Sequence, residues 1–263
     1  MPAPIVLLTD FGLSDGYAGV LHGVILGLNP GAQVVDLSHD VPPQDIRAAA
    51  YVLSTAYRYF PAGSIFVVVV DPGVGSARQP IAVEAEGRLF VAPDNGVLTP
   101  VLAEEGARVV RLSEPRYWLP NPSRTFHGRD IFAPVAAHLS LGVPLSALGE
   151  PLPEPVLLRA SRPEPRPDGG WLAHIQHIDR FGNLITDLRP TPEALEQIEG
   201  AEVHGRPVSL LVETYADIPP DTPALLIGSG GYLEIAVRDG DAHLELGAEV
   251  GDDVMVYVTD VTA

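Results

Sequence analysis

Polar side chains stand where several apolar runs of the sequence end, and these residues are the first candidates for chemistry. Asp10 follows "IVLLT", Asp36 and His39 lie in and after "QVVDLS", and "VVVV" at 67–70 leads into Asp71 and then Arg78. In an open α/β sheet, ligands bind at the carboxyl ends of the strands, so the pattern indicates a ligand site there. The alternative for each residue taken alone is a turn or helix cap formed by its own side chain.

The segment "TFHGRD" at 125–130 places His127 and Asp130 before an apolar helical stretch. Histidine titrates near neutral pH, so His127 is a candidate catalyst, although a cap or core role fits equally well. A rival hypothesis is a metal site built from some of Asp10, Asp15, His39, His127 and Asp130. Because none of them shows a dedicated ligand spacing, the metal hypothesis ranks second.

The second half of the chain contains two further candidate segments. In "HIDRFGNLITD", at 177–187, Asp179, Phe181 and Asn183 interrupt a β pattern. An aromatic face beside an amide suits purine recognition, whereas the plain alternative is a turn with a buried Phe. In "IGSGGYLEI", Ser229 and Gly230 suit a backbone nest for a carboxylate, or simply a hairpin turn.

Alternating strands and helices must position the first set of candidates. The sequence predicts a strand from Ile5 to Leu8 and a helix from Ser14 to Leu28, and the segment at 64–70 is apolar on both faces, as in a sheet covered by helices. The later elements expected here are strands at 33–38, 81–85, 88–92 and 107–112 and helices at 44–60, 96–105 and 130–142. The fold class is therefore α/β, with a mostly parallel sheet flanked by helices.

A proline-rich stretch separates this part from a β-rich part. We expect an α/β domain over residues 1–152, a linker over 153–168 and an all-β barrel domain over 169–263. The expected strands of the second domain lie at 171–178, 183–188, 208–213, 224–229, 232–237 and 253–258.

Composition excludes several classes of protein. The formal net charge is -18, from 34 acidic and 16 basic residues, and this charge disfavours nucleic acid and anionic membranes as partners. There is no cysteine and no lysine, which excludes disulfides, thiolate chemistry and Schiff bases. The opening apolar run is too short to span a membrane, and cytoplasmic is the default location.

Taken together and in order, seven motifs carry a resemblance. They are "LLTDFGLSDGY", "VDLSHDVPPQD", "VVVVDPGVGSAR", "APDNGVLT", "FHGRD", "FGN" and "GSGGYLEI". This ordered set resembles the S-adenosyl-L-methionine hydroxide adenosyltransferase family, adenosine-forming hydrolases related to fluorinase and chlorinase. The resemblance implies an α/β domain, a β-barrel and a homotrimer with ligand sites between subunits. It implies S-adenosyl-L-methionine as substrate, adenosine and L-methionine as products, and neither a cofactor nor a metal.

The resemblance also implies a set of residue roles. Asp71, Arg78 and His127 match the set around the attacking water; either His127 accepts the proton or Arg78 stabilises a developing hydroxide. The implied substrate contacts are Asp10 on the ribose hydroxyls, Asp15 and Asp179 on the methionine ammonium, Phe181, Asn183 and Tyr215 on adenine, and Ser229, with Gly230 beside it, on the carboxylate.

Several positions depart from the halogenating relatives. The fluorinase has Tyr in place of Asp71, Trp in place of Gln44 and Arg in place of Gly230, and here Gly128 stands where the halide pocket uses a hydroxyl or small residue. Hydrolysis of S-adenosyl-L-methionine is the main hypothesis. A halide-dependent transferase is disfavoured by Asp71, and a sensor of adenosine or S-adenosyl-L-methionine with negligible turnover is the non-enzymatic alternative.

Overall fold

The computed structural model describes residues 3–159, 161–167 and 169–259. Residues 1–2 and 260–263, at the ends of the two expected domains, and residues 160 and 168 of the expected linker lie outside the described residues. The chain divides into two compact units, Met1–Leu158 and Arg159–Ala263. The two-domain organisation is thus confirmed, while the exact limits of the linker stay a prediction.

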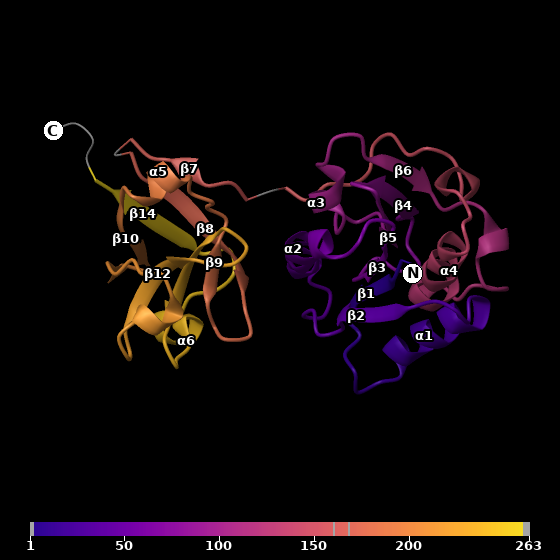
Figure 1. The fold of residues 1–263 in the computed structure, drawn as a ribbon, viewed down its shortest axis with the longest axis horizontal. Helices are drawn as coiled ribbons and strands as arrows, with labels where there is room; N and C mark the ends of the chain where they lie inside the picture. The colour runs from indigo at the N-terminus through magenta and orange to yellow at the C-terminus, as the bar shows by residue number, and fades with distance from the viewer. Residues whose placement is uncertain (1–2, 160, 168, 260–263) are drawn as a thin grey trace. The chain divides into compact units, whose positions relative to one another are not determined.

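The first unit is a six-stranded sheet with helices on both faces (Figure 1). Its strands are β1 (Ile5–Thr9), β2 (Val34–Ser38), β3 (Ile65–Val69), β4 (Pro80–Ala85), β5 (Arg88–Pro93) and β6 (Arg108–Arg111), in the order β2-β1-β3-β5-β4-β6. Its helices are α1 (Tyr17–Leu28), α2 (Ile46–Ala56), α3 (Thr99–Leu102) and α4 (Ala133–Ser140). Short 3-10 turns are η1 (Tyr57–Tyr59), η2 (Pro115–Tyr117) and η4 (Leu145–Ala147), and η3 (Gly128–Phe132) is a π-helix.

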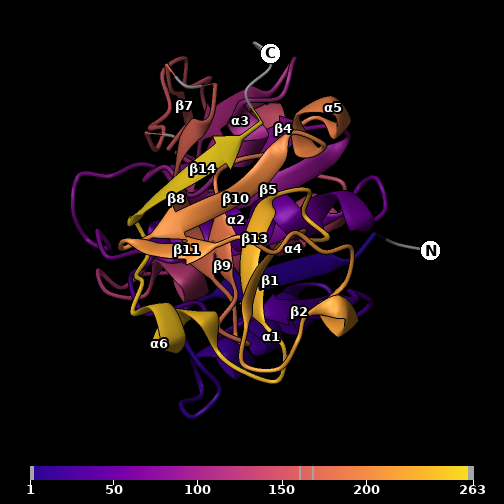
Figure 2. The same cartoon turned by 90° about the vertical axis from the view of Figure 1, so that its left-hand side faces the viewer.

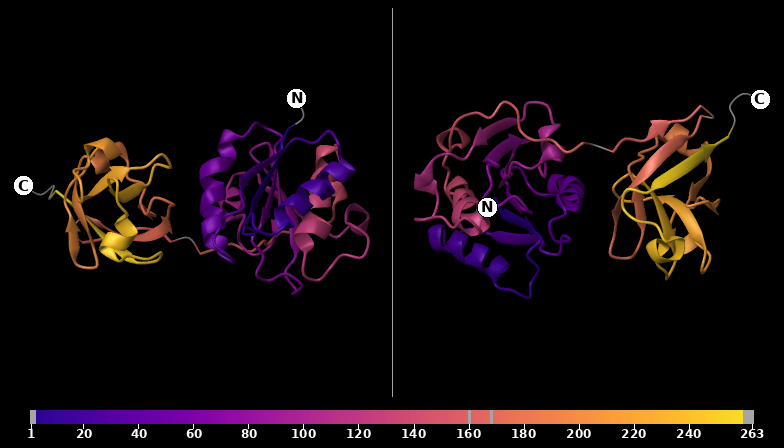
Figure 3. Two further views of the ribbon diagram at one scale, coloured as in Figure 1. Left: turned by 90° about the horizontal axis from the view of Figure 1, so that it is seen from below. Right: turned by 180° about the vertical axis from the view of Figure 1, so that it is seen from behind.

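Alternation along β1 divides the core of this unit between the two faces of the sheet. Ile5 and Leu7 pack in the cluster that contains residues of α1 and α4, whereas Val6 and Leu8 pack in the cluster that contains residues of α2 and α3. Figure 3 shows α2 on one face of the sheet and α1 with α4 on the other. Because side chains of a strand point alternately to opposite faces, an uninterrupted apolar run is what a doubly covered strand requires.

The sheet is mixed: most of its pairings are parallel, as expected, but one strand, β4, is reversed. β1 pairs parallel with β2 and β3, and β3 with β5, but β4 is antiparallel to both β5 and β6. The reversal follows from a two-residue turn at Glu86–Gly87, where both residues have positive φ, as in a type I′ hairpin.

Two helix predictions were wrong in extent. The helix expected over 96–105 is the single turn α3, since Gly96 has a left-handed φ of +94° and Pro100 stands at the start of the helix. The helix expected over 130–142 begins as the π-helix η3 and continues as α4.

The described residues of the second unit form one antiparallel sheet of eight strands (Figure 2). Its strands are β7 (Glu164–Pro165), β8 (Trp171–Ile178), β9 (Leu184–Thr186), β10 (Ile198–Val203), β11 (Arg206–Val208), β12 (Pro223–Ile227), β13 (Leu233–Val237) and β14 (Asp253–Val258). The helices are short: α5 (Pro192–Leu195), η5 (Tyr215–Asp217) and α6 (Ala242–Leu246). Residues after β11 bridge to β12 through Leu211 and Leu225, so the sheet is nearly closed and barrel-like.

Candidate active site

The glycine-rich loop after β3 folds back so that Arg78 pairs with Asp71. Arg78 donates from Nε to Oδ1 of Asp71 over 2.9 Å and from Nη2 to Oδ2. Both side chains are buried, with 8% and 6% of their surface exposed. The loop needs Gly75, because its φ is +78° and a Cβ there would lie 2.5 Å from the Arg124 carbonyl oxygen. The loop therefore holds a two-contact, buried ion pair.

His127 joins this pair and its tautomer follows from the contact. Nη2 of Arg78 lies 2.7 Å from Nδ1 of His127. A guanidinium only donates, so Nδ1 accepts and the neutral ring carries its proton on Nε2. Burial and the charge of Arg78 lower the pKa of His127, and these effects outweigh the opposing charges of Asp71 and Asp130. His127 is accordingly neutral at pH 7, with a donor on Nε2.

Arg78 keeps one more donor available. Its Nη1 is buried and has no hydrogen-bond partner among the described residues. The guanidinium carbon lies 5.4 Å from the centre of the Phe132 ring, which supports it from the side. A buried N–H without a partner carries an energetic cost, and a water or substrate oxygen would satisfy it.

A cavity of about 240 Å³ brings the predicted residues of the first unit together. The polar residues that line it are Asp10, Gln44, Asp71, Thr125 and His127; the others are Phe11, Val69, Pro72, Val74, Phe126 and Gly128. A Cβ on Gly128 would lie 3.3 Å from both Phe11 and Phe126, so a larger residue would crowd this wall. Of the polar residues expected to meet at the strand ends, Asp10 and Asp71 line this cavity, whereas Asp36, His39 and Arg78 do not.

Asp10 is held by backbone, whereas Asp15 is not part of this cavity. The Gln44 backbone N–H donates to Oδ2 of Asp10 over 2.8 Å, and Gln44 adopts a left-handed φ of +67° to do so. Gln44 therefore holds Asp10 through its main chain. Asp15 lies exposed before α1, outside the residues that line the cavity.

In the second unit, Asp179 organises the turn between β8 and β9. Its Oδ1 accepts from the backbone N–H groups of Phe181 and Asn183, each over 2.9 Å, and its Oδ2 accepts from Nδ2 of Asn183 over 2.9 Å. Asn183 is buried, whereas Phe181 is 75% exposed. The plain alternative of a turn with a buried Phe is therefore wrong for Phe181.

Glu234, in β13, is a candidate that sequence reasoning missed. Tyr215 donates from its hydroxyl to Oε2 of Glu234 over 2.9 Å. Burial raises the pKa of Glu234 and the charge of Asp179 adds to this, against the lowering effect of Tyr215. Gly228 lies against the same carboxyl group, since a Cβ there would lie 1.7 Å from Oε1. The available signal was a lone acid in the apolar run "YLEIAV".

Ser229 and Gly230 lie in the hairpin between β12 and β13. The Gly228 N–H donates to Tyr232 O and the Gly231 N–H to Gly228 O, as in an ordinary hairpin turn. Ser229 is exposed. The turn thus exposes the Ser229 hydroxyl directly after Gly228, the residue that lies against the carboxyl group of Glu234.

The five residues weighed as metal ligands are not gathered at one point. Asp130 pairs with Arg129 over 2.6 Å and accepts from Ser123 N, and Asp15 stands apart on an exposed segment. His39 lies instead beside His22 and Asp36.

Comparison with known proteins agrees with both units. Residues 5–149 match the SAM hydroxide adenosyltransferase N-terminal domain, and residues 173–255 match the C-terminal domain of the same family. The chain belongs to this family. The resemblance found in the sequence is thereby confirmed.

The relatives that match most of this chain include proteins named as hydrolases and, at lower identity, proteins named as fluorinases. An (R)-S-adenosyl-L-methionine hydrolase of Thermus thermophilus is 43% identical over 260 residues, covering 94% of this chain and 97% of its own. A hydrolase of the same name from Salinispora tropica is 40% identical, covering 97% and 98%. A fluorinase of an Actinoplanes species is 30% identical, covering 90% and 92%.

Solved structures show the same fold. An uncharacterized conserved protein from Thermotoga maritima gives a TM-score of 0.89 at 36% identity, covering 96% of this chain and 99% of that chain. A conserved hypothetical protein from Thermus thermophilus gives 0.80 at 39% identity, covering 97% and 99%.

Proposed function

We propose that the chain hydrolyses S-adenosyl-L-methionine to adenosine and L-methionine by attack of water at the ribose 5′ carbon. The observation that carries the proposal is the buried Asp71–Arg78–His127 set, with Asp71 and His127 on the wall of a cavity that also contains Asp10. The hydrolases among the relatives support the same reaction class.

The reaction needs little from the protein besides position. A lone pair of the water oxygen forms the bond to C5′, and the C5′–S bond breaks with its electron pair going to sulfur. The sulfonium thus leaves as a neutral thioether without an acid, and the proton lost from the attacking oxygen completes the balance. Placing the water in line with the C5′–S bond supplies most of the acceleration.

We propose the three roles from the hydrogen bonds of the site. Asp71 and His127 line the cavity, so the Nε2–H of His127 is the proposed donor to the water, whereas Arg78, which does not line the cavity, holds Asp71 and His127 in place and carries the positive charge beside them. Because Nδ1 of His127 already accepts from Arg78, His127 is a poor proton acceptor in this arrangement. Asp71 carries the free lone pairs, so the proton passes to Asp71 as the bond to C5′ forms, when the oxygen is most acidic.

The remaining candidates are proposed for recognition. Asp10 binds the ribose hydroxyls, and Phe181, Asn183 and Tyr215 receive adenine. The other proposed contacts are Asp15 and Asp179 with the methionine ammonium and Ser229, next to Gly230, with its carboxylate. Asp179 already accepts three N–H groups, so the ammonium would use its remaining lone pairs.

The candidate residues belong to two separate units, and a complete site requires both. We propose the homotrimer that the family resemblance implies, with each site formed by the first unit of one subunit and the second unit of another. Exposed apolar side chains, among them Leu13, Tyr17, Phe181 and Tyr215, are compatible with burial in such an assembly. No helix in the described part of the chain is long and apolar enough to cross a membrane. The cytoplasmic location, the fully closed barrel and the linker limits stay predictions.

The test is product analysis after incubation with S-adenosyl-L-methionine in halide-free buffer. We expect equal amounts of adenosine and methionine, lost in Asp71→Asn, which keeps the shape of the side chain but removes its charge. A 5′-halo product that forms only with added halide would identify a transferase instead. Tight adenosine binding with no product under either condition would identify a sensor.

A further inference from the structure

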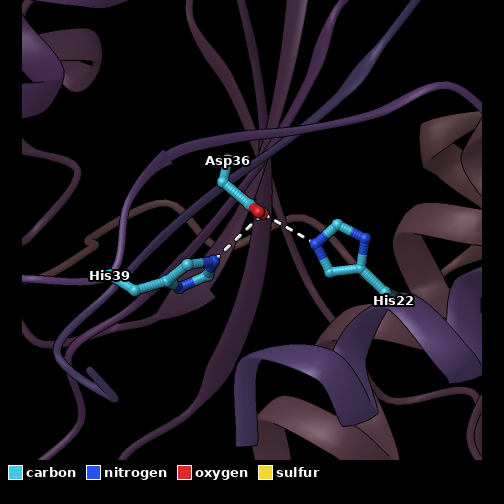
Figure 4. Close-up of side chains that lie close together, drawn as sticks. All are labelled: His22, Asp36 and His39. Carbon is cyan, nitrogen blue, oxygen red and sulfur yellow. Dashed lines mark hydrogen bonds and ion pairs between the residues drawn. The ribbon is translucent and has the colours of Figure 1, made fainter. Parts of the chain in front are cut away.

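A second cluster of polar side chains lies at the edge of the first unit, on α1, β2 and the loop that follows β2. Figure 4 shows His22 and His39 pointing from opposite sides at the carboxylate of Asp36. Nε2 of His22 lies 2.7 Å and Nε2 of His39 lies 3.0 Å from the same oxygen, Oδ1 of Asp36. One ligand atom from each residue lies within 4.8 Å of the other two.

The buried Nε2 atom of His39 is the feature that most indicates a ligand. Its side chain is only 2% exposed, yet Nε2 has no hydrogen-bond partner among the described residues and meets Asp36 only as an ion-pair contact. The contact with Asp36, at a geometry that falls short of a hydrogen bond, offsets only part of the desolvation cost of this buried nitrogen. A cation that accepts the Nε2 lone pair removes this cost.

The other nitrogen of His39 has the partner that a metal-binding histidine needs. Nδ1 lies 2.7 Å from Oγ1 of the buried Thr9, which also accepts from the Phe11 backbone N–H. In the tautomer that binds a metal, Nδ1–H donates to Thr9 and Nε2 is left with its lone pair. Such a hydrogen bond from the second ring nitrogen orients nearly every histidine that ligates a metal.

We propose that His22, Asp36 and His39 bind one divalent transition-metal ion, with Zn²⁺ the best match. Two imidazole nitrogens and one carboxylate oxygen, without sulfur, form a donor set typical of zinc. Ligand bonds of about 2.0–2.1 Å at tetrahedral angles separate the ligand atoms by roughly 3.3 Å. The two nitrogens lie 2.7 and 3.0 Å from Oδ1 of Asp36, and all three ligand atoms lie within 4.8 Å of one another, so the side chains would shift by about an ångström to hold an ion. His22 and Asp36 are 30% and 44% exposed, which gives an ion access and leaves a position for water.

This site is separate from the candidate active site and does not depend on the proposed reaction. None of its three residues lines the cavity that contains Asp10 and Asp71. It is connected to that region through the main chain, since the Gly12 N–H donates to the His39 carbonyl oxygen over 2.7 Å. A bound ion would therefore stiffen the segment around Asp10 without touching the substrate.

The competing explanation is a hydrogen-bonded His–Asp–His cluster that needs no metal. In that case both Nε2–H groups donate to Asp36, and added zinc finds no site. Calorimetric titration with Zn²⁺ alone, on tag-free protein treated with a chelator and then freed of it, separates the two. We expect one ion per chain in the unaltered protein.

Variants locate the ion. His22→Ala should weaken binding by more than about 100-fold, beyond the 10- to 100-fold typical of an outer-shell change, and Thr9→Val should fall within that smaller range. His204→Ala is the matched control: His204 also contacts a carboxylate, Asp252 over 2.9 Å, but the described residues offer it no third ligand, so its loss should change nothing.

A second readout is thermal unfolding with and without Zn²⁺. An ion that binds only the folded chain raises the melting temperature, and His22→Ala should abolish this rise. The proposal is overturned if the unaltered protein shows no saturable binding, or if His22→Ala binds Zn²⁺ and responds to it as the unaltered protein does.

Discussion

The two units hold their candidate residues in opposite ways. In the first, Asp71 and Arg78 are buried and paired, with 6% and 8% of their side chains exposed. In the second, Phe181 and Tyr215 are 75% and 46% exposed, on segments that connect strands. Buried, fixed charges are what a reaction needs at its centre, because they cost no reorganisation when charge moves. Exposed aromatic faces suit binding, so we propose that the first unit carries turnover and the second contributes affinity.

Removing the guanidinium of Arg78 should break this division most sharply. Arg78→Ala removes the guanidinium that pairs with Asp71 and contacts His127, and turnover should fall by about 100- to 1,000-fold, as for a lost transition-state donor. The affinity for S-adenosyl-L-methionine, measured by calorimetry, should stay within several-fold. Arg108→Ala, which breaks an exposed pair with Glu84, should leave both quantities unchanged. Full turnover in Arg78→Ala would remove this residue from the reaction.

The opposite pattern is expected for Phe181→Ala. Loss of aromatic stacking on a base costs about 1–3 kcal/mol, so KM should rise roughly 5- to 150-fold while kcat changes little. Steady-state kinetics of adenosine formation by the purified protein measure both constants. Tyr59→Ala is the control, because Tyr59 is an even more exposed aromatic, at 84%, outside the candidate residues. An unaltered KM would leave Phe181 without a part in adenine recognition.

The same contrast explains which features could be read from the sequence. Uninterrupted apolar runs such as β3 predict strands covered on both faces, and polar residues directly after such strands meet at one edge, as Asp10 and Asp71 do. His127 reaches the same cavity from the segment before η3, which the strand pattern does not predict. The antiparallel course of β4 was not predicted, because its two-residue turn has Glu86 before Gly87 in place of the Asn or Asp that usually indicates such a turn.

Contacts between distant residues were beyond the sequence pattern. Glu234 sits in an apolar run where an outward-facing acid is the ordinary expectation, and only the hydroxyl of Tyr215, 19 residues away, identifies it as buried and partnered. Likewise His22 was not singled out, since its closeness to Asp36 and His39 depends on how α1 packs beside β2.

A pH profile tests the first unit more finely. Burial and Arg78 lower the pKa of His127 below the usual 6.5, so the neutral ring persists to more acidic pH. Once protonated, Nδ1 becomes a donor and can no longer accept from Arg78, so kcat should fall on the acid side with an apparent pKa below that of an ordinary histidine. His127→Asn should lose this limb of the profile. His138→Gln should retain it, although burial lowers the pKa of His138 too.

The smallest effect is expected from the buried acid of the second unit. Burial raises the pKa of Glu234 above 4.5, against the hydrogen bond from Tyr215 and with the charge of Asp179. The folded chain then holds this proton more tightly than the unfolded chain, so the contribution of Glu234 to the free energy of unfolding is complete below about pH 4.5 and declines as the pH rises through the raised pKa. Glu234→Gln should remove this decline, seen by denaturant unfolding at a series of pH values, whereas Glu199→Gln, at an exposed position, should not. If the free energy of unfolding changes equally with pH in the unaltered protein, Glu234→Gln and Glu199→Gln, then the carboxyl group of Glu234 titrates like an ordinary one and its burial does not make the stability of the second unit depend on pH.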